Sequence, residues 1–360
     1  MLDYQPTPEG KTGGMRQATI RDVAREAAVS VASVSRALNG HGNVRSELRE
    51  RVEAVAARLG YVPHAGARNL SLARANAIGV VLPDLHGEFF SETLRGMDRQ
   101  ASARGLHLLL STVHPGGDRA VEALRAMRGR VDGMVVMAPH VAPAQLLAHL
   151  PPDLPVLLLN CADPTGERPM LGVDNAGGAA MMVRHLVESG RRRILHLAGP
   201  DTNVEAMARA EGYLAAIAAC PGLEPRIIPG DFREESGIAA ARELLRDLDR
   251  VDAVFAANDM MAIGALVTLR RAGIAVPGRI AVAGFDDIPL ARLITPGLST
   301  IRFGVEQIGA RAVERLADLL AGTGSREAER CPPELVIRET TDQAITPSPH
   351  PDGHNRGTPS

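Results

Sequence analysis

The sequence is poor in aromatic residues and in cysteine. Aromatic residues make up 2% of the 360 residues and tryptophan is absent, so few rings could stack on a sugar or a base. The cysteines Cys161, Cys220 and Cys331 lie far apart and form no CxxC pair. This pattern predicts neither a disulfide framework nor a cysteine metal site, and we expect free thiols in a reducing compartment.

Long hydrophobic runs are also missing. No stretch of about 18 or more uncharged apolar residues occurs, which predicts that no helix spans a membrane. The first residues contain no apolar segment of the kind found in secretory signals. We therefore expect a cytoplasmic protein.

The motifs of common enzyme classes are absent as well. The sequence contains no GxSxG, GxxxxGKS/T, HExxH or GxGxxG pattern. We therefore predict no catalytic residues, no metal site and no cofactor, and this argues against a Rossmann enzyme with an added helical cap. His350 and His354 form an HxxxH pattern near the C-terminus, which alone is a weak indication of metal binding.

Charge is distributed unevenly along the chain. The net charge is only -2, but from Arg16 to Arg74 ten arginines stand against five acidic residues, a local charge of +5. A basic head on an acidic body indicates that the head has a nucleic-acid partner.

The sequence pattern divides the chain into five parts. Residues 1–17 and 343–360 lack apolar periodicity and are expected to be disordered tails. Between them we predict a helical head at 18–60, a linker at 61–76 and a long body at 77–342.

The body alternates short apolar runs with amphipathic segments. This alternation predicts parallel sheets with helical crossovers, and the number of units favours two Rossmann-like lobes over one sheet. Each run is predicted to be a strand covered on both faces: Ile78–Leu82, Leu106–Leu110, Gly133–Met137, Val156–Leu159, Ile194–Ala198, Ala253–Ala257 and Ile280–Phe285.

The head has the pattern of a helix-turn-helix. Thr19 and Asp22 predict a capping box for a first helix, and Ser30 can cap a second. A third helix beginning at Ser46 is expected to brace the pair. The alternative is a helical cap on the body, but the local charge of +5 and the small polar residues that begin the second helix favour DNA binding.

These residues resemble the lactose/galactose repressor (LacI/GalR) family. The segment from Ala18 to Asn39, ATIRDVAREAAVSVASVSRALN, is similar to the family's DNA-binding signature. Two further segments match its body signatures in the right order: VDAVFAANDMMAIG from Val251, and GFDDIPLAR from Gly284 with LSTIR ending at Arg302. The resemblance implies a three-helix helix-turn-helix head plus a two-lobed, periplasmic-binding-protein-like α/β body.

The resemblance also implies a function. It predicts a sequence-specific DNA-binding repressor that acts on a near-palindromic double-stranded operator. No leucine heptad follows Ile337, so we expect a homodimer rather than a tetramer. The alternative is a cytoplasmic sugar-binding receptor whose head does not bind DNA; the missing secretory signal and the basic head argue against it.

The implied DNA contacts lie in the head and linker. The second helix would enter the major groove, and Pro63–Leu70 resembles a hinge helix in which Leu70 wedges into the minor groove beside Ala67. Gly66 should make that hinge helix easier to melt. Ala28 stands where the family commonly has glycine, which fits if its φ stays negative. Of the other implied contacts, Val31, Ala32 and Ser33 would face bases, and Arg36 would contact a base edge or a phosphate. The residues implied at phosphates are Thr19, Ser30, Ser35 and Asn39.

An effector site between the lobes is implied as well, with a sugar or sugar derivative as the expected ligand. Arg209 would be a bidentate donor, Phe232 a stacking ring, and Asn258 and Asp286 would act from the opposite lobe. Singly, an ion pair, core packing or a helix cap would explain these residues. Gly87 and Glu88 depart from the family's usual Asn-Pro, which leaves the effector class open. The implied effector residues are Phe89, Asn160, Arg209, Phe232, Asn258 and Asp286.

Overall fold

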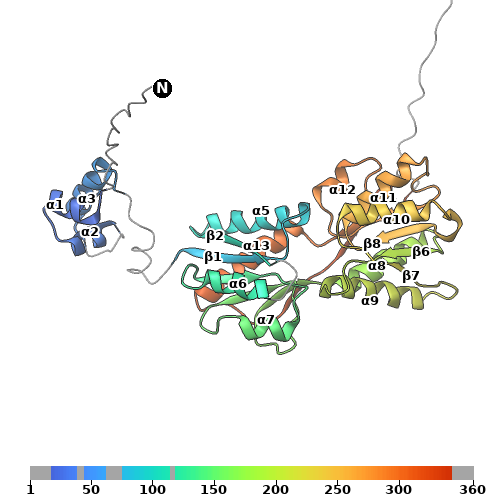
Figure 1. Ribbon diagram of the computed structural model, residues 1–360, viewed down its shortest axis with the longest axis horizontal. Helices are drawn as coiled ribbons and strands as arrows, with labels where there is room; N and C mark the ends of the chain where they lie inside the picture. The colour runs from blue at the N-terminus through green and yellow to red at the C-terminus, as the bar shows by residue number, and fades with distance from the viewer. Residues whose placement is uncertain (1–17, 39–43, 62–74, 114–117, 343–360) are drawn as a thin grey trace, which may run out of the picture. The chain divides into compact units, whose positions relative to one another are not determined.

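The computed structural model describes residues 18–38, 44–61, 75–113 and 118–342 (Figure 1). They form two compact units that divide after Ala75: a helical head and an α/β body. In the described residues, no helix is long and apolar enough to cross a membrane. The expected tails, the hinge segment with Gly66, and His350 and His354 lie outside these ranges.

The head consists of three short helices: α1 (Ile20–Glu26), α2 (Val31–Leu38) and α3 (Ser46–Arg58). The predicted capping box is present, since Asp22 Oδ2 accepts from Thr19 N at 3.0 Å and Thr19 Oγ1 accepts from Asp22 N at 3.4 Å. The small apolar residues of the three helices, spaced three and four apart, meet in one core. Its buried members are Val23, Ala24, Ala27, Val34, Ala37, Val52, Val55 and Ala56.

Ala28, in the turn between α1 and α2, differs from the expectation. Its φ is +55°, in the left-handed region, and not negative. The turn requires this conformation because Ala28 N donates to Arg25 O and Val29 N donates to Ala24 O, the pattern in which a left-handed residue closes a helix. The folded head therefore contains the steric strain of a Cβ in the left-handed conformation.

The first lobe of the body is a six-stranded parallel sheet. Figure 1 shows α5 (Glu88–Ser102) and α13 (Val305–Leu320) on one side of its first strand, and α6 (Asp118–Met127) and α7 (Pro143–His149) on the other. The strand order is β11 (Glu329–Cys331), β5 (Met170–Val173), β4 (Val156–Leu159), β3 (Gly133–Val136), β1 (Ala77–Leu82) and β2 (His107–Thr112).

Two glycines set the spacing of α5 and α13. A Cβ on Gly96 would lie 1.9 Å from Glu306 O, and one on Gly309 would lie 2.1 Å from Thr93 O. Both distances are far below any real contact, so only glycine permits this close approach. The tight pair of helices covers the sheet core around Val80.

The expectation that every strand is covered on both faces is wrong for β2. Its residues are half-buried or exposed, and Leu110 is 51% exposed. β2 is the edge strand of the sheet and pairs only with β1 among the described strands. Its side chains therefore have a neighbouring strand along one edge only, and the other edge is open to solvent. The central strands β1, β3 and β4 are buried throughout, as predicted.

The second lobe is a four-stranded parallel sheet in the order β7 (Arg226–Ile228), β6 (Ile194–Leu197), β8 (Ala253–Ala256) and β9 (Ala281–Ala283). Alternate side chains of β8 enter different cores. Phe255 packs with α8 (Asn175–Glu188) and α9 (Val204–Ala218), whereas Val254 packs with α10 (Glu234–Leu244) and α11 (Asp259–Arg271). Figure 1 shows the two helix pairs on opposite sides of the sheet.

The chain passes between the lobes after β5, after β10 (Thr300–Arg302) and after β11. β10 pairs antiparallel with β12 (Glu334–Val336). Two short helices complete the second lobe: η1 (Leu248–Arg250) and α12 (Pro289–Leu293). The two parallel sheets confirm the predicted pair of lobes.

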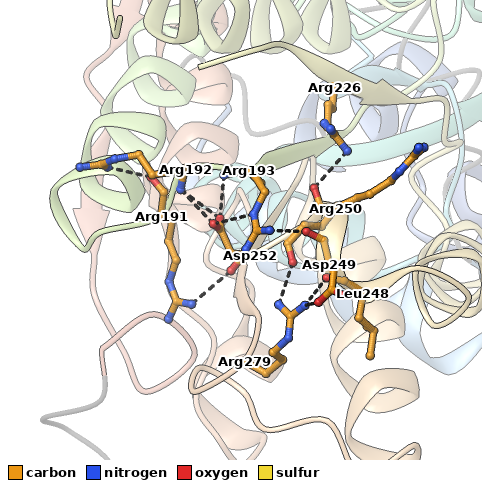
Figure 2. Close-up of polar contacts among 10 residues, drawn as sticks. Arg191, Arg192, Arg193, Arg226, Leu248, Asp249, Arg250, Asp252 and Arg279 are labelled. Carbon is orange, nitrogen blue, oxygen red and sulfur yellow. Dashed lines mark hydrogen bonds and ion pairs between the residues drawn. The ribbon is translucent and has the colours of Figure 1, made fainter. Parts of the chain in front are cut away.

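Asp252 lies at the amino ends of the inner strands β6 and β8 of the second sheet and joins the loops there (Figure 2). Its carboxylate accepts from Arg192 N at 3.1 Å and from Arg193 N at 2.9 Å, and the Arg193 guanidinium lies 3.4 Å away. Neighbouring arginines donate to backbone carbonyls, as Arg279 does to Val251 O and Arg226 to Arg250 O. These arginines therefore bind the free carbonyl groups at the amino ends of the strands.

Replacing Ala28 by glycine should stabilise the head. Glycine adopts a left-handed φ without the steric cost of a Cβ, so Ala28→Gly should raise the head's unfolding free energy by about 1 kcal/mol. Hydrogen exchange of the α1 and α3 amides in the full chain measures this. Ala57→Gly, at an exposed helical position in α3, should have the opposite sign. An unchanged or lower stability in Ala28→Gly would contradict the strain.

Asp252→Ala should destabilise the body by about 1–3 kcal/mol, because it leaves two amide donors without their acceptor and removes the ion pair with Arg193. Urea unfolding of the full chain, followed by circular dichroism, gives the value. Asp249→Ala is the matched control, since that carboxylate is 99% exposed and pairs only with Arg279 among the ion pairs of the described chain. Equal losses in the two variants would contradict the role of Asp252.

Candidate functional site

The first turn of α2 is exposed on the surface of the head. Val31, Ala32 and Arg36 are exposed, while Val34 and Ala37 on the opposite face are buried. Arg36 Nε donates to Ala32 O at 3.3 Å, which holds the guanidinium along the outer face of the helix. A helix that shows small side chains and one arginine outward can lie close to a nucleic-acid groove.

Two of the hydroxyl residues that are expected to contact phosphates, Thr19 and Ser30, also cap helices. Ser30 Oγ accepts from Ser33 N at 3.1 Å and lies 2.9 Å from Ser33 Oγ, so it caps α2. Ser35 is half-buried. The other expected contacts, Asn39, Ala67 and Leu70, lie outside the described residues.

The body contains a small cavity of about 80 Å³ between the two sheets. It lies beyond the carboxyl ends of strands from both lobes, where ligands bind in parallel α/β folds. Five of the six expected effector residues line it: Phe89, Arg209, Phe232, Asn258 and Asp286. Phe89 comes from the first lobe, at the start of α5.

Arg209, on α9, is the centre of this site and is only 3% exposed. Its Nε donates to Asn175 Oδ1 at 2.8 Å, its Nη1 donates to Ala257 O, and its Nη2 lies 3.3 Å from Asp286 Oδ1. The guanidinium also lies 3.9 Å from the centroid of the Phe285 ring. Each of its three nitrogens thus has one protein partner, and a ligand can either use the remaining N–H donors or replace a partner.

The expectation that Asn258 and Asp286 face Arg209 from the opposite lobe is wrong. The chain enters the second lobe at α8, so α9 packs on the same sheet that carries the loops after β8 and β9. All three side chains therefore belong to the second lobe. The first lobe contributes Pro83, His86, Gly87, Phe89, Phe90, Met137 and Pro139 to the lining.

Asn258 holds the loop that carries Phe232. Its Nδ2 donates to Phe232 O at 2.8 Å, and its Oδ1 accepts from Met261 N at 3.0 Å, which caps α11. Phe232 has a φ of +69°, a conformation that a non-glycine residue adopts only when its surroundings enforce it. The bond from Asn258 supplies that constraint and fixes the ring in the cavity wall.

Asn160 lies in a neighbouring cavity of about 470 Å³ and not in the first one. It follows β4, has a φ of +51° and is 5% exposed. Within the described residues, neither amide atom of Asn160 has a hydrogen-bond partner. The Asn160 side chain lies beside Glu205 and lowers the pKa of that carboxyl group, and its amide can bind a polar group in this cavity.

Glu205 was missed in the sequence and lines both cavities. It is 8% exposed, and its Oε1 lies 3.4 Å from Asn175 Nδ2. The signal that could have found it is spacing, since a residue four positions before Arg209 lies on the same helix face. Asn175, at the start of α8, was missed too and contacts both Glu205 and Arg209.

Burial dominates the electrostatics of the site. Desolvation raises the pKa of Glu205 to about 7; the Arg209 charge opposes this rise and the Asp286 charge adds to it. Desolvation likewise raises the pKa of Asp286 to about 6, against the pull of Arg209. Two carboxyl groups and one guanidinium, flanked by rings, can bind a polar ligand rich in hydrogen-bonding groups.

Both parts of the chain are similar to known protein families. Residues 19–64 match the family described as bacterial regulatory proteins, lacI family, and residues 183–341 match the periplasmic binding protein-like domain. Catabolite control protein A of Priestia megaterium is 30% identical over 336 residues, covering 92% of this chain and 96% of that protein. The chain belongs to the lacI family of bacterial regulatory proteins.

Other lacI-family members agree. The HTH-type transcriptional repressor CytR of Escherichia coli is 34% identical over 90% of this chain and 96% of its own length. Among solved structures, the lac repressor dimer bound to operator and an anti-inducer superposes with a TM-score of 0.83 at 29% identity, covering 91% of this chain and 99% of that one. This lacI-family protein is therefore a DNA-binding transcriptional regulator.

The buried Glu205 should make the stability of the body depend on pH. Because the folded pKa of about 7 exceeds the ordinary value of 4.5, the folded state binds more protons than the unfolded chain between these values. Stability should therefore fall as pH rises through this range. Glu205→Gln should remove about 1–3 kcal/mol of that fall between pH 5 and 8.

Urea unfolding at pH 5 and pH 8 checks this expectation. The groups around Glu205 are Arg209, Asp286, Asn160, Asn175 and Cys161. The part of the pH dependence of the unfolding free energy that is due to Asp286 should remain in Glu205→Gln. Glu211→Gln, at an exposed position on the same helix, is the control and should behave as the wild type. Parallel pH curves for wild type and Glu205→Gln would contradict the buried-carboxyl account.

Proposed function

We propose that this protein is a transcriptional repressor whose operator affinity is switched by a small molecule bound in the body. The observation that carries the proposal is the lacI-family match over residues 19–64 on a head whose α2 starts with an exposed surface. The body supplies the second requirement, a cavity at the carboxyl ends of strands from both lobes.

In this proposal α2 lies in the major groove. Val31 and Ala32 have no hydrogen-bonding side chain and would contact thymine methyl groups, whereas Ser33 and Arg36 would reach base edges or phosphates. Thr19, Ser30, Ser35 and Asn39 would fix the register on the backbone. Leu70, beside Ala67, would wedge into the minor groove at the operator centre.

The operator is proposed to be near-palindromic and bound by a homodimer. Two identical heads related by a twofold axis read two half-sites, so the symmetry of the protein appears in the DNA. The lac repressor structure with operator is that of a dimer.

The effector is proposed to be a sugar or sugar derivative. The ribose operon repressor of Escherichia coli is 33% identical over 306 residues, and the regulator CelR was solved as a cellobiose complex at a TM-score of 0.67. Phe89, Asn160, Arg209, Phe232, Asn258 and Asp286 would contact the ligand. Binding would shift the population of lobe arrangements and thereby release the operator.

The competing function is a sugar-binding receptor whose head does not bind DNA. The basic charge of the head and the regulators among its relatives argue against it. We propose that the protein has no catalytic activity and acts in the cytoplasm, since these relatives are regulators of transcription.

Selection of bound duplexes from a random DNA library by the full chain tests the proposal. A palindromic consensus and a steep loss of affinity with salt are expected. On the selected site, Arg36→Ala should weaken binding by about 1–3 kcal/mol.

Arg242→Ala is the matched control, since it removes the same charge from an exposed position on α10 of the body. It should leave operator affinity unchanged. If no sequence is enriched, or if Arg36→Ala binds like the control, the receptor function is favoured instead.

A further inference from the structure

The charges that line the 80 Å³ cavity are unbalanced. The lining contains two buried carboxyl groups, of Glu205 and Asp286, and one guanidinium group, of Arg209. His86 also lines the cavity, but its ring is 38% exposed and its Nε2 lies 3.1 Å from Glu234 Oε2, a further acid. The wall is therefore richer in acceptors than in donors.

The hydrogen bonds increase this imbalance. Arg209 directs its donors to Asn175, Ala257 and Asp286. Glu205, in contrast, accepts a long hydrogen bond at 3.4 Å from Asn175 Nδ2 and lies beside the Asn160 amide. The ion pair of Asp286 Oδ1 with Arg209 Nη2, at 3.3 Å, lacks hydrogen-bond geometry. Acceptors of this kind favour a ligand that donates.

Glu205 also stands at the junction of the two cavities. It is the residue that lines both the 80 Å³ cavity with Arg209 and the 470 Å³ cavity with Asn160. Asn160 is nine-tenths buried, and its amide lacks partners within the described residues. A ligand that extends from Arg209 toward Asn160 must therefore contact the Glu205 carboxyl group.

We propose that Glu205 makes this site selective for uncharged polyhydroxyl ligands and against sugar phosphates and sugar acids. This inference rests on the proposed function, in which the site holds the effector, and it names the chemical class of that effector.

The selectivity follows from what each group can do. A hydroxyl group donates to a carboxylate and accepts from a guanidinium, so a polyol can insert between Asp286 and Arg209 and also satisfy Glu205. A phosphate or carboxylate only accepts. Its charge would have to lie beside two buried carboxyl groups with one guanidinium for compensation, and burying such an unpaired charge is costly. Burial raises the pKa of Glu205, which agrees with a site in which a buried negative charge is costly.

Calorimetric titration of the full chain with matched ligands tests the proposal. Each set shares one skeleton: ribose and ribose 5-phosphate; glucose, gluconate and glucose 6-phosphate; cellobiose and cellobionate; cytidine and its 5′-monophosphate. We expect the uncharged member of at least one set to bind, with at least about tenfold higher affinity than its anionic partners.

Two variants assign the preference to Glu205. Glu205→Gln keeps the size and removes the carboxylate, and Glu205→Ser also removes the bulk. Both should reduce the ratio between uncharged and anionic affinities by about tenfold or more. Glu243→Gln, on the exposed side of α10 and away from both cavities, should keep the wild-type ratio.

The outcomes separate this proposal from the proposed function. Tighter binding of an anionic member, no binding of any uncharged member, or an unchanged ratio in both Glu205 variants would overturn the selectivity. If an uncharged sugar binds with the expected preference but leaves operator affinity unchanged, the selectivity stands and the proposed switch fails. If a sugar phosphate binds and releases the operator, the switch stands and the selectivity fails.

Discussion

One buried guanidinium, of Arg209, joins the segments that form the wall of the cavity. Arg209 joins the start of α8, the end of β8 and the loop after β9 through Asn175, Ala257 and Asp286. A charge this deeply buried is stable only while its partners stay in place. Arg209 therefore joins three of the segments that form the cavity wall, and Asn258 holds a fourth, the loop that carries Phe232.

This arrangement explains how a ligand could affect the whole body. The cavity of about 80 Å³ is smaller than the roughly 300 Å³ or more of ordinary ligand sites. A ligand therefore has to move side chains or lobes, and the Arg209–Asp286 ion pair is the contact that a hydroxyl can replace without leaving either charge unpaired. Asp286 follows β9, and the chain continues from there through β10 to α13 of the first lobe. A change at Asp286 thus lies on a segment that connects the lobes.

Most of the fold could be predicted from the sequence because its signals are local. The capping box at Thr19, the apolar spacing in α2 and the buried runs of β1, β3, β4, β6 and β8 each depend on neighbouring residues. The short strands β5, β7, β10, β11 and β12 have only three or four residues, and several carry charged side chains, so their sequences do not distinguish them from loops. β2 was predicted as a strand but not as an edge, since strand order is a property of the whole sheet.

The site was only partly predictable for the same reason. Five of the six expected effector residues line one cavity, but the placement of Asn160 in a second cavity depends on how the lobes pack. The left-handed φ of Ala28 follows from the turn between α1 and α2, which its own residue type opposes. Glu205 escaped notice because acids in the first turn of a helix are common, and only tertiary structure shows that this one is buried beside Arg209 and Asp286.

We expect a ligand to act by replacing the contact between Arg209 and Asp286. A crystal structure of the full chain with a bound sugar tests it most directly. We expect a ligand hydroxyl between the two side chains, with Arg209 Nη2 and Asp286 Oδ1 no longer within ion-pair distance. A ligand bound elsewhere, with the 3.3 Å ion pair intact, would contradict it.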